Sequence, residues 1–359
     1  MWGLDSLLAA SAMDLAGRAA LAYLAVHAIR TLLEWSDSSN APARGKEHSF
    51  DPHEAPAHRH YRFNADRTLW LHTQWWLPRT DVEWKGIIFI SHGYNEHIER
   101  YHFVATTLAD RGFAVLGMTH QGMGLSEGDR LYVEHFSHYE NDLVAFIRDT
   151  LALTSESAHA KEALMRLPDG LALSSLPRFL LSHSMGALVS LQVIHNHPDI
   201  KWTGAIMSSG AFQIDPKMIS PLEQKAAAVL SAIFPKFRPP NPDIPNILRD
   251  PREHERALRD SLNFKTGPPA RWISEFIAAQ VRAPAMFPNI KTPLLIFHGE
   301  KDGVTPPAGS AALFAGAASP SKEMHLVPNM FHELLHDTCR DSMVDQMVAW
   351  AARISNEQA

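Results

Sequence analysis

Cysteine is almost absent from this sequence. Among 359 residues only Cys339 is a cysteine, so no intrachain disulfide can form, and neither a cysteine-based zinc cluster nor a CxxC redox pair is available. A reducing compartment fits this composition. We therefore expect a cytoplasmic protein, and association with a membrane is left open by the apolar N-terminal segment described below.

An excess of positive charge is also missing. The formal net charge is −6, the sequence pI is about 6.4, and no block of Lys and Arg provides a local basic patch. Proteins that bind nucleic acid carry such a patch to contact phosphates. We therefore expect no nucleic-acid partner.

No hydrophobic run is long enough to cross a membrane. Residues 7–33 are rich in Leu and Ala, but charged residues interrupt them, and a bilayer span needs about 20 consecutive apolar residues. We interpret residues 1–35 as an apolar helix that packs on the protein's own body or on a second subunit, lies in a membrane interface, or serves as a targeting segment. Residues 36–58 are polar and rich in Pro and Ser, which predicts a linker.

The rest of the chain alternates between strand and helix patterns. Hydrophobic residues make up 45% of the sequence and charged residues 20%, which is ordinary for a globular protein. From about residue 59, apolar runs separated by helical patterns predict an α/β fold, with a mostly parallel sheet covered by helices on both faces. Residues 211–288 lack a strand signal and predict an inserted helical cap, or lid. The expected core comprises residues 59–210 and 289–359.

One serine lies where a strand pattern gives way to a helical pattern. The run LLSHSMGALVS places Ser184 between Ser182 and Gly186. A sharp strand-to-helix turn that exposes a serine hydroxyl needs small residues two positions to either side, normally G-x-S-x-G. Serine replaces the first glycine here, and because its side chain has only two heavy atoms we expect the turn to accommodate it. Ser184 is therefore a candidate nucleophile at the carboxyl edge of the sheet.

Two residues downstream are candidates for the base and the acid that such a serine needs. A serine hydroxyl is a poor nucleophile at neutral pH until a base accepts its proton, and a carboxylate must orient that base. LLIFHGEKD ends a strand with Asp302, and LVPNMFHELLHD follows another strand with His332. The order Ser, Asp, His is the one expected for this type of fold. Glu300 is an alternative acid, but we expect it to occupy a solvent-facing turn.

Two backbone amides are candidates for stabilising a developing oxyanion, which requires fixed N–H donors. The amide of Met185 directly follows the candidate nucleophile, and the amide of Tyr94 lies after FISHG, where Gly93 lets the backbone turn. We expect no cofactor and no metal for this chemistry.

These segments resemble the α/β-hydrolase branch of monoglyceride lipases and bacterial lysophospholipases. The resemblance covers about residues 60–355 and is densest in SHGYNEHIERYHFVATTLADRGFAVLGMTHQGMGLSEGDR, LLSHSMGALVS, TPLLIFHGEKDGVTPP and VPNMFHELLHD. It implies the α/β-hydrolase fold, and it assigns the triad and the oxyanion hole to Ser184, Asp302, His332, Tyr94 and Met185. Two positions depart from the family pattern. Ser182 replaces a glycine, and the bulky Tyr94 replaces a small residue, which bears on the shape of the acyl pocket.

One competing motif overlaps the candidate histidine. The run from His332 to His336 matches H-E-x-x-H, in which two histidines one helical turn apart bind zinc. The chain has 21 histidines, which makes chance matches common, and a zinc site needs at least three convergent ligands. Few residues follow His336, and we expect Glu357 to lie in an unstructured tail. A zinc protease is therefore the weaker interpretation.

The sequence also bears on three other function classes. Residues 122–128 are one position off the dinucleotide-binding fingerprint and are expected to form a turn. A hydrolase with an aspartate nucleophile is opposed by the serine at position 184. A non-catalytic ligand-binding protein is left open, because a fold does not fix a function.

The sequence thus predicts a serine ester hydrolase that works through an acyl-enzyme. The resemblance, the cap and the apolar N-terminal segment favour a monoacylglycerol- or lysophospholipid-like substrate, with peripheral membrane contact through that segment or the cap. A carboxylesterase or acyltransferase acting on a non-lipid ester is the alternative. Several apolar cap residues are candidates either for lining an acyl pocket or for packing against the body: Met218, Ile219, Leu222, Val229, Leu230, Ile233 and Phe234.

Overall fold

The structure is a computed structural model that describes residues 59–152, 171–214, 219–239 and 247–358. The predicted N-terminal helix and linker, and Met218, lie outside the described residues. Within them, no helix is both long and apolar enough to span a bilayer.

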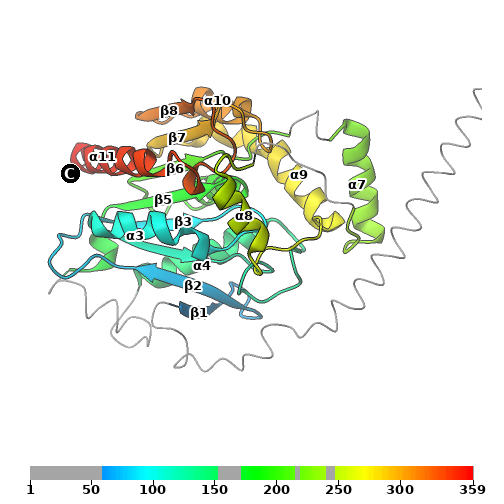
Figure 1. The fold of residues 1–359 in the computed structure, drawn as a ribbon, viewed down its shortest axis with the longest axis horizontal. Helices are drawn as coiled ribbons and strands as arrows, with labels where there is room; N and C mark the ends of the chain where they lie inside the picture. Colours follow the sequence, from blue (N-terminus) through cyan, green and yellow to red (C-terminus); the bar gives the residue numbers. More distant parts are fainter. Residues whose placement is uncertain (1–58, 153–170, 215–218, 240–246, 359) are drawn as a thin grey trace, which may run out of the picture.

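The described strands form one eight-stranded sheet in the order β1-β2-β4-β3-β5-β6-β7-β8 (Figure 1). β2 pairs antiparallel with β1 and β4, and the other neighbours pair in parallel. The predicted mostly parallel sheet is therefore confirmed. The strands are β1 (Arg59–Phe63), β2 (Trp70–Trp76), β3 (Gly86–Ser91), β4 (Phe113–Met118), β5 (Arg178–His183), β6 (Gly204–Ser208), β7 (Leu294–Gly299) and β8 (Lys322–Val327).

Helices cover both faces of this sheet (Figure 1). One face packs against α3 and α11, and the other packs against α4, α6, α9 and α10. The helices are η1 (Ile98–Tyr101), α3 (His102–Asp110), α4 (Ser137–Leu151), η2 (Leu173–Ser175), α6 (Met185–Asn196), α7 (Pro221–Ile233), α8 (Pro251–Arg259), α9 (Ala270–Met286), η3 (Phe287–Asn289), α10 (Pro307–Gly316), η4 (Leu334–His336) and α11 (Arg340–Gln358).

The central strands are apolar along their whole length because helices cover them on both sides. β3, with the sequence GIIFIS, and β4, with FAVLGM, are buried at every residue. The parallel pairing brings the carboxyl ends of β3, β5 and β6 to one edge, where Ser91 lies opposite Ser182 and His183 lies opposite Ser208. This edge carries the candidate site.

The segment between β6 and β7 contains α7, α8 and α9. Ser220 begins α7 with a capping box, in which its side chain accepts the amide of Glu223 and the Glu223 side chain accepts the amide of Ser220. α7 packs beside α9 at the periphery of the molecule, whereas α9 also contacts α6 beneath it (Figure 1). The limits proposed for the cap, residues 211–288, enclose all three helices.

The C-terminal segment differs from the prediction. Glu357 does not lie in an unstructured tail, because α11 continues to Gln358 and Arg353 pairs with Glu357 at 3.2 Å, one helical turn away. Buried residues of α11, including Trp350 and Ile354, anchor the helix to the sheet. This burial stabilises the helix to its end.

Candidate active site

Ser184 lies in the sharp turn between β5 and α6. Its backbone has φ 52° and ψ −119°, a sparsely populated conformation for a residue with a side chain, which costs about 1–3 kcal/mol. Several hydrogen bonds hold it there. The Ser184 amide donates to Ser208 O at 3.0 Å, and its carbonyl accepts the amides of Ala187 and Ala211, each at 3.1 Å. The strand-to-helix geometry is that of a nucleophile turn.

The two residues flanking this turn have different space around them. A Cβ on Gly186 would lie 2.1 Å from Ser91 O and 2.5 Å from His92 O, so the backbone of β3 leaves no room for a side chain. At the other flank Ser182 is fully buried, and its hydroxyl donates to Ile206 O at 3.3 Å. The serine that departs from the family pattern is therefore accommodated with a hydrogen bond.

Asp302 and His332 form a buried acid–base pair. His332 Nδ1 donates to Asp302 Oδ2 at 2.7 Å. The amides of Val304 and Thr305 donate to Asp302 Oδ1 at 2.7 and 2.9 Å, which fixes the carboxylate. Glu300 instead accepts the amide of Asn329 at 2.9 Å at the surface. Of the two candidate acids, Asp302 is thus the one that the fold brings to His332.

The charges of this pair favour its ionised form. Burial disfavours the charged carboxylate of Asp302, but the charge of His332 and the hydrogen bonds from His298 and His332 outweigh it and hold the Asp302 pKa well below its usual value. Burial likewise favours a neutral His332, but the charge and hydrogen bond of Asp302, with smaller effects of Glu333 and Glu96, raise the His332 pKa. An imidazolium at position 332 is therefore stabilised.

His332 lies beside the turn that carries Ser184. The ring of His183, which directly precedes Ser184, is 4.7 Å from the ring of His332 between centroids. Burial and the nearby His332 lower the pKa of His183 to about 4, so His183 is neutral at neutral pH. The structure thus brings the sequence-predicted serine, aspartate and histidine to one edge of the sheet.

The turn after β3 packs against Ser184. A Cβ built on Gly93 would lie 3.2 Å from Ser184 Cβ and 2.8 Å from Glu96 Oε1, so glycine allows the close approach of this turn to Ser184. His92 stabilises the turn, because its Nε2 accepts the amide of His120 at 2.9 Å and its Nδ1 donates to Gly93 O at 2.7 Å. The next amide in the turn is that of Tyr94.

Tyr94 and Met185 supply the two candidate oxyanion amides. Met185 is the first residue of α6, where amides have no acceptor inside their own helix. The side chain of Tyr94 extends to the cap: its ring is 3.7 Å from that of Trp272 in α9, and its hydroxyl donates to Leu131 O at 3.3 Å. The bulk that departs from the family pattern therefore packs against α9.

The H-E-x-x-H pattern does not form a zinc-binding helix. Residues 334–336 form only a short 3-10 turn, and the two histidines have different partners. His332 bonds Asp302, whereas His336 Nε2 lies 3.5 Å from Glu96 Oε2 and Glu333 pairs with Arg100. Among the described residues, no group of three or more His, Cys, Asp and Glu side chains could hold a metal ion.

Four large apolar side chains of α7 and of its C-terminal cap residue are exposed. Leu222, Val229, Ile233 and Phe234 are 76%, 61%, 63% and 52% exposed. These four side chains are therefore not packed into the body, and their contact with an acyl chain stays a prediction. The helical spacing is real, but the apolar side chains project into solvent.

A buried group that sequence reasoning missed lies next to the site. Glu96, Arg100 and Glu333 form ion pairs across the gap between the turn after β3 and the loop after β8. In the sequence, Glu333 stands out only as part of the H-E-x-x-H pattern. The charge of Glu96 four residues before Arg100 was a local signal for one pair, but nothing local indicates the contact with Glu333.

Comparison with known proteins identifies the family. Residues 82–339, most of the chain, match the family model described as serine aminopeptidase, S33. The chain belongs to this family. It is a serine ester hydrolase with the α/β-hydrolase fold.

Relatives within this family are named for lipid esters. A monoacylglycerol lipase of Mycolicibacterium smegmatis is 27% identical over 275 residues, which cover 77% of this chain and 90% of that protein. The monoglyceride lipase of Mus musculus is 26% identical over 291 residues, or 80% and 88% of the two chains. A solved soluble variant of the Saccharomyces cerevisiae monoglyceride lipase, in complex with a substrate analog, has a TM-score of 0.70 at 19% identity and covers 85% of this chain and 98% of its own. This last likeness shows the shared fold.

Proposed function

We propose that this hydrolase cleaves monoacylglycerol- or lysophospholipid-like esters through an acyl-enzyme on Ser184. The observation that carries the proposal is the Asp302–His332 hydrogen bond beside the strained turn of Ser184. This geometry supports a mechanism in which a hydroxyl, a base and an acid from three distant parts of the chain act together. The names of the relatives support a single-chain lipid ester as the substrate class.

The proposed reaction uses these groups in two halves. His332 Nε2 accepts the proton of Ser184 Oγ as that oxygen bonds to the ester carbonyl carbon, and the amides of Met185 and Tyr94 donate to the carbonyl oxygen as it becomes negative. His332 then donates the proton to the leaving alcohol as its C–O bond breaks. Water repeats the sequence on the acyl-enzyme, releasing the fatty acid and restoring Ser184. Asp302 orients the imidazole and stabilises its cation throughout.

We also propose that the exposed face of α7 contacts the lipid surface in which such substrates reside. Four large apolar side chains, those of Leu222, Val229, Ile233 and Phe234, are more than half exposed on this one short segment. Burial of an exposed Val, Leu, Ile or Phe side chain contributes about 1.5–3 kcal/mol. Contact through α7 would therefore bring the cap, and with it the rest of the enzyme, to the substrate.

The test is hydrolysis of a panel of esters by the wild-type chain and by Ser184→Ala. We expect the wild type to release fatty acid from monoacylglycerol or lysophosphatidylcholine, and from long-chain p-nitrophenyl esters in preference to short ones. Ser184→Ala should fold normally, as judged by circular dichroism, and show no turnover. Undiminished turnover by that variant would refute the serine mechanism, and activity confined to short acyl chains would refute the lipid substrate.

A further inference from the structure

A buried cluster of charged side chains joins the turn after β3 to the loop that carries His332. Arg100, in η1, lies between two carboxylates. Its Nη1 is 3.1 Å from Glu96 Oε2, and its two Nη groups donate to the two carboxylate oxygens of Glu333. The side chains of Arg100, Glu96 and Glu333 are only 12%, 3% and 13% exposed. The cluster is thus held largely away from water.

Each end of this cluster is attached to a proposed part of the catalytic machinery. Glu96 Oε1 accepts the amide of Gly93, and it also accepts the hydroxyl of Tyr101 at 2.9 Å. Gly93 packs against Ser184 and directly precedes Tyr94. Glu333 directly follows His332. Arg100 thus bonds to both carboxylates and links the two ends.

We propose that Arg100 is a positioning residue that fixes the turn after β3 relative to the loop that carries His332. The inference rests on the proposed function and deepens it. Glu96 fixes the turn through the Gly93 amide, Glu333 fixes the loop, and Arg100 sets the distance between them. Lysine could not do the same, because an ammonium group lacks the planar fork that bonds two carboxylates at once.

The cluster also acts on the charge of His332. Glu333 and Glu96 favour the imidazolium that forms when His332 accepts the serine proton, and Arg100 opposes it. The histidine faces other titratable groups from β5, from the loop after β7 and from its own loop. Among the described residues, the charged and titratable groups around it are Asp302, His298, His183, His336, Glu333, Glu96 and Arg100.

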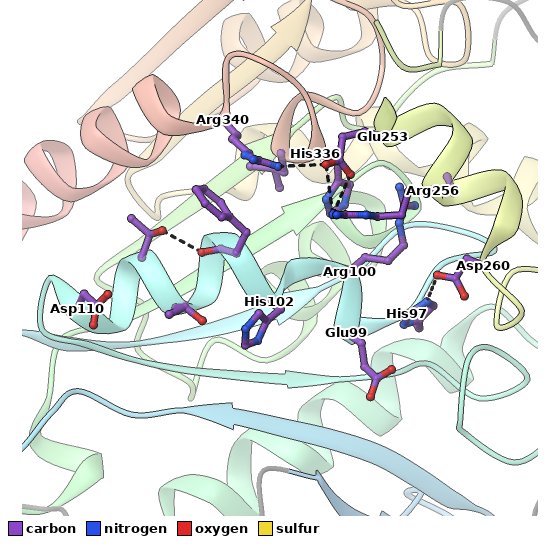
Figure 2. A pocket seen from close by; sticks show the side chains of 15 residues that line it. His97, Glu99, Arg100, His102, Asp110, Glu253, Arg256, Asp260, His336 and Arg340 are labelled. Carbon is purple, nitrogen blue, oxygen red and sulfur yellow. Dashed lines mark hydrogen bonds and ion pairs between the residues drawn. The ribbon is translucent and has the colours of Figure 1, made fainter. Parts of the chain in front are cut away.

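Arg100 can be reached from solvent through a cavity. A cavity of about 600 Å³ lies between α3, α8 and η4, and its lining includes Arg100, His336, Glu253, Arg256 and Arg340 (Figure 2). Figure 2 shows Arg256 and Arg340 on the α8 and α11 sides of this space, where both pair with Glu253. Removal of the Arg100 side chain would open the cavity onto the two carboxylates.

This access allows a chemical-rescue experiment. Arg100→Ala should lower kcat about 100-fold, the loss typical of a displacement near 1 Å at a reacting centre, with little change in KM. Millimolar guanidinium chloride should restore kcat about tenfold with saturation, because the free cation re-forms the charge-assisted hydrogen bonds. Sodium chloride of equal ionic strength should not restore kcat, because it supplies ionic screening without the guanidinium cation. Active-site titration with a fluorophosphonate corrects for any misfolded fraction.

Two further variants show whether the effect belongs to Arg100. Arg256 lines the same cavity and, among the described residues, pairs with Glu253. We therefore expect Arg256→Ala to cause no loss of kcat and to show no effect of guanidinium. Arg100→Lys should remain impaired. If Arg100→Ala keeps the wild-type kcat per titrated site, or if rescue is absent, the positioning role is overturned.

Two readouts separate a positioning role from a merely structural one and from failure of the proposed function. Glu333→Gln removes a negative charge beside His332, so the acid limb of kcat/KM should shift to lower pH. An unchanged limb would contradict the proposal.

Hydrogen exchange is the second readout, and it needs no turnover. In Arg100→Ala, the amides of residues 92–96 and 332–336 should both exchange faster than in the wild type. A wild-type chain without esterase activity would refute the proposed function, and exchange confined to one segment would refute the coupling.

Discussion

Substitution of Gly186 by alanine tests the geometry of the proposed oxyanion hole most selectively. A Cβ at this position would lie 2.1 Å from Ser91 O, whereas real Cβ contacts essentially never fall below 3.0 Å. The start of α6 and the end of β3 must therefore separate by about 0.9 Å. Met185 lies at the start of α6, and Tyr94 lies in the turn that follows β3. The substitution therefore moves the two proposed oxyanion donors apart.

A displacement of this size has two measurable consequences. Forced overpacking costs about 1–3 kcal/mol of folding free energy, and a misplacement near 1 Å costs about 100-fold in rate. We therefore expect Gly186→Ala to remain folded but to lose about 100-fold in kcat per titrated serine. Urea unfolding and ester hydrolysis measure the two effects. Gly316→Ala in α10 is the matched control, because its added Cβ would lie 3.1 Å from Phe287 Cβ and needs a shift of only a few tenths of an ångström. Wild-type kcat in Gly186→Ala would refute the assignment of the paired amides.

Three further predictions concern the acid, the buried carboxylates and the cap. Asp302→Asn should lower kcat by about 10⁴-fold, because it disturbs the tautomer and cation of the base, whereas Glu300→Gln should stay within about twofold; equal losses would contradict the choice of Asp302. The pKa values of Asp302, Glu96 and Glu333 are all held low, so the stability they contribute is present above their unfolded values, near about 4, and is lost as pH falls through their folded values. Urea titrations from pH 6 to pH 3 should show this decline, and a flat free energy of unfolding would exclude it. Ile233→Ser should weaken cosedimentation with phospholipid vesicles by about tenfold, while unchanged binding would remove α7 from the membrane contact.

The residues whose signals lie close together in the sequence were predictable. Five consecutive residues predict the turn at Ser184, and buried parallel strands such as β3 have continuous apolar sequences. The order of Ser184, Asp302 and His332 then follows from the order of strands in the fold. These features depend on local backbone chemistry and on topology, both of which the pattern of residues encodes.

Features that depend on distant contacts were not predictable in the same way. Arg100 and Glu333 are far apart in the sequence, and their pairing follows from the way η1 meets the loop after β8. The apolar spacing of α7 is the same whether its residues pack, line a pocket or face solvent, so the exposure of Ile233 could not be inferred. The Glu357 prediction was wrong because low hydrophobicity at a chain end does not reveal that buried residues further back anchor the helix.

The central claim is that Ser184 is the nucleophile, and it is tested most directly by mass spectrometry of the covalently labelled chain. A fluorophosphonate reacts with a serine that an adjacent base activates. We expect one adduct per chain, mapped by peptide sequencing to Ser184, and no adduct in Ser184→Ala. An adduct at another serine, or equal labelling of the Ser184→Ala variant, would contradict the account.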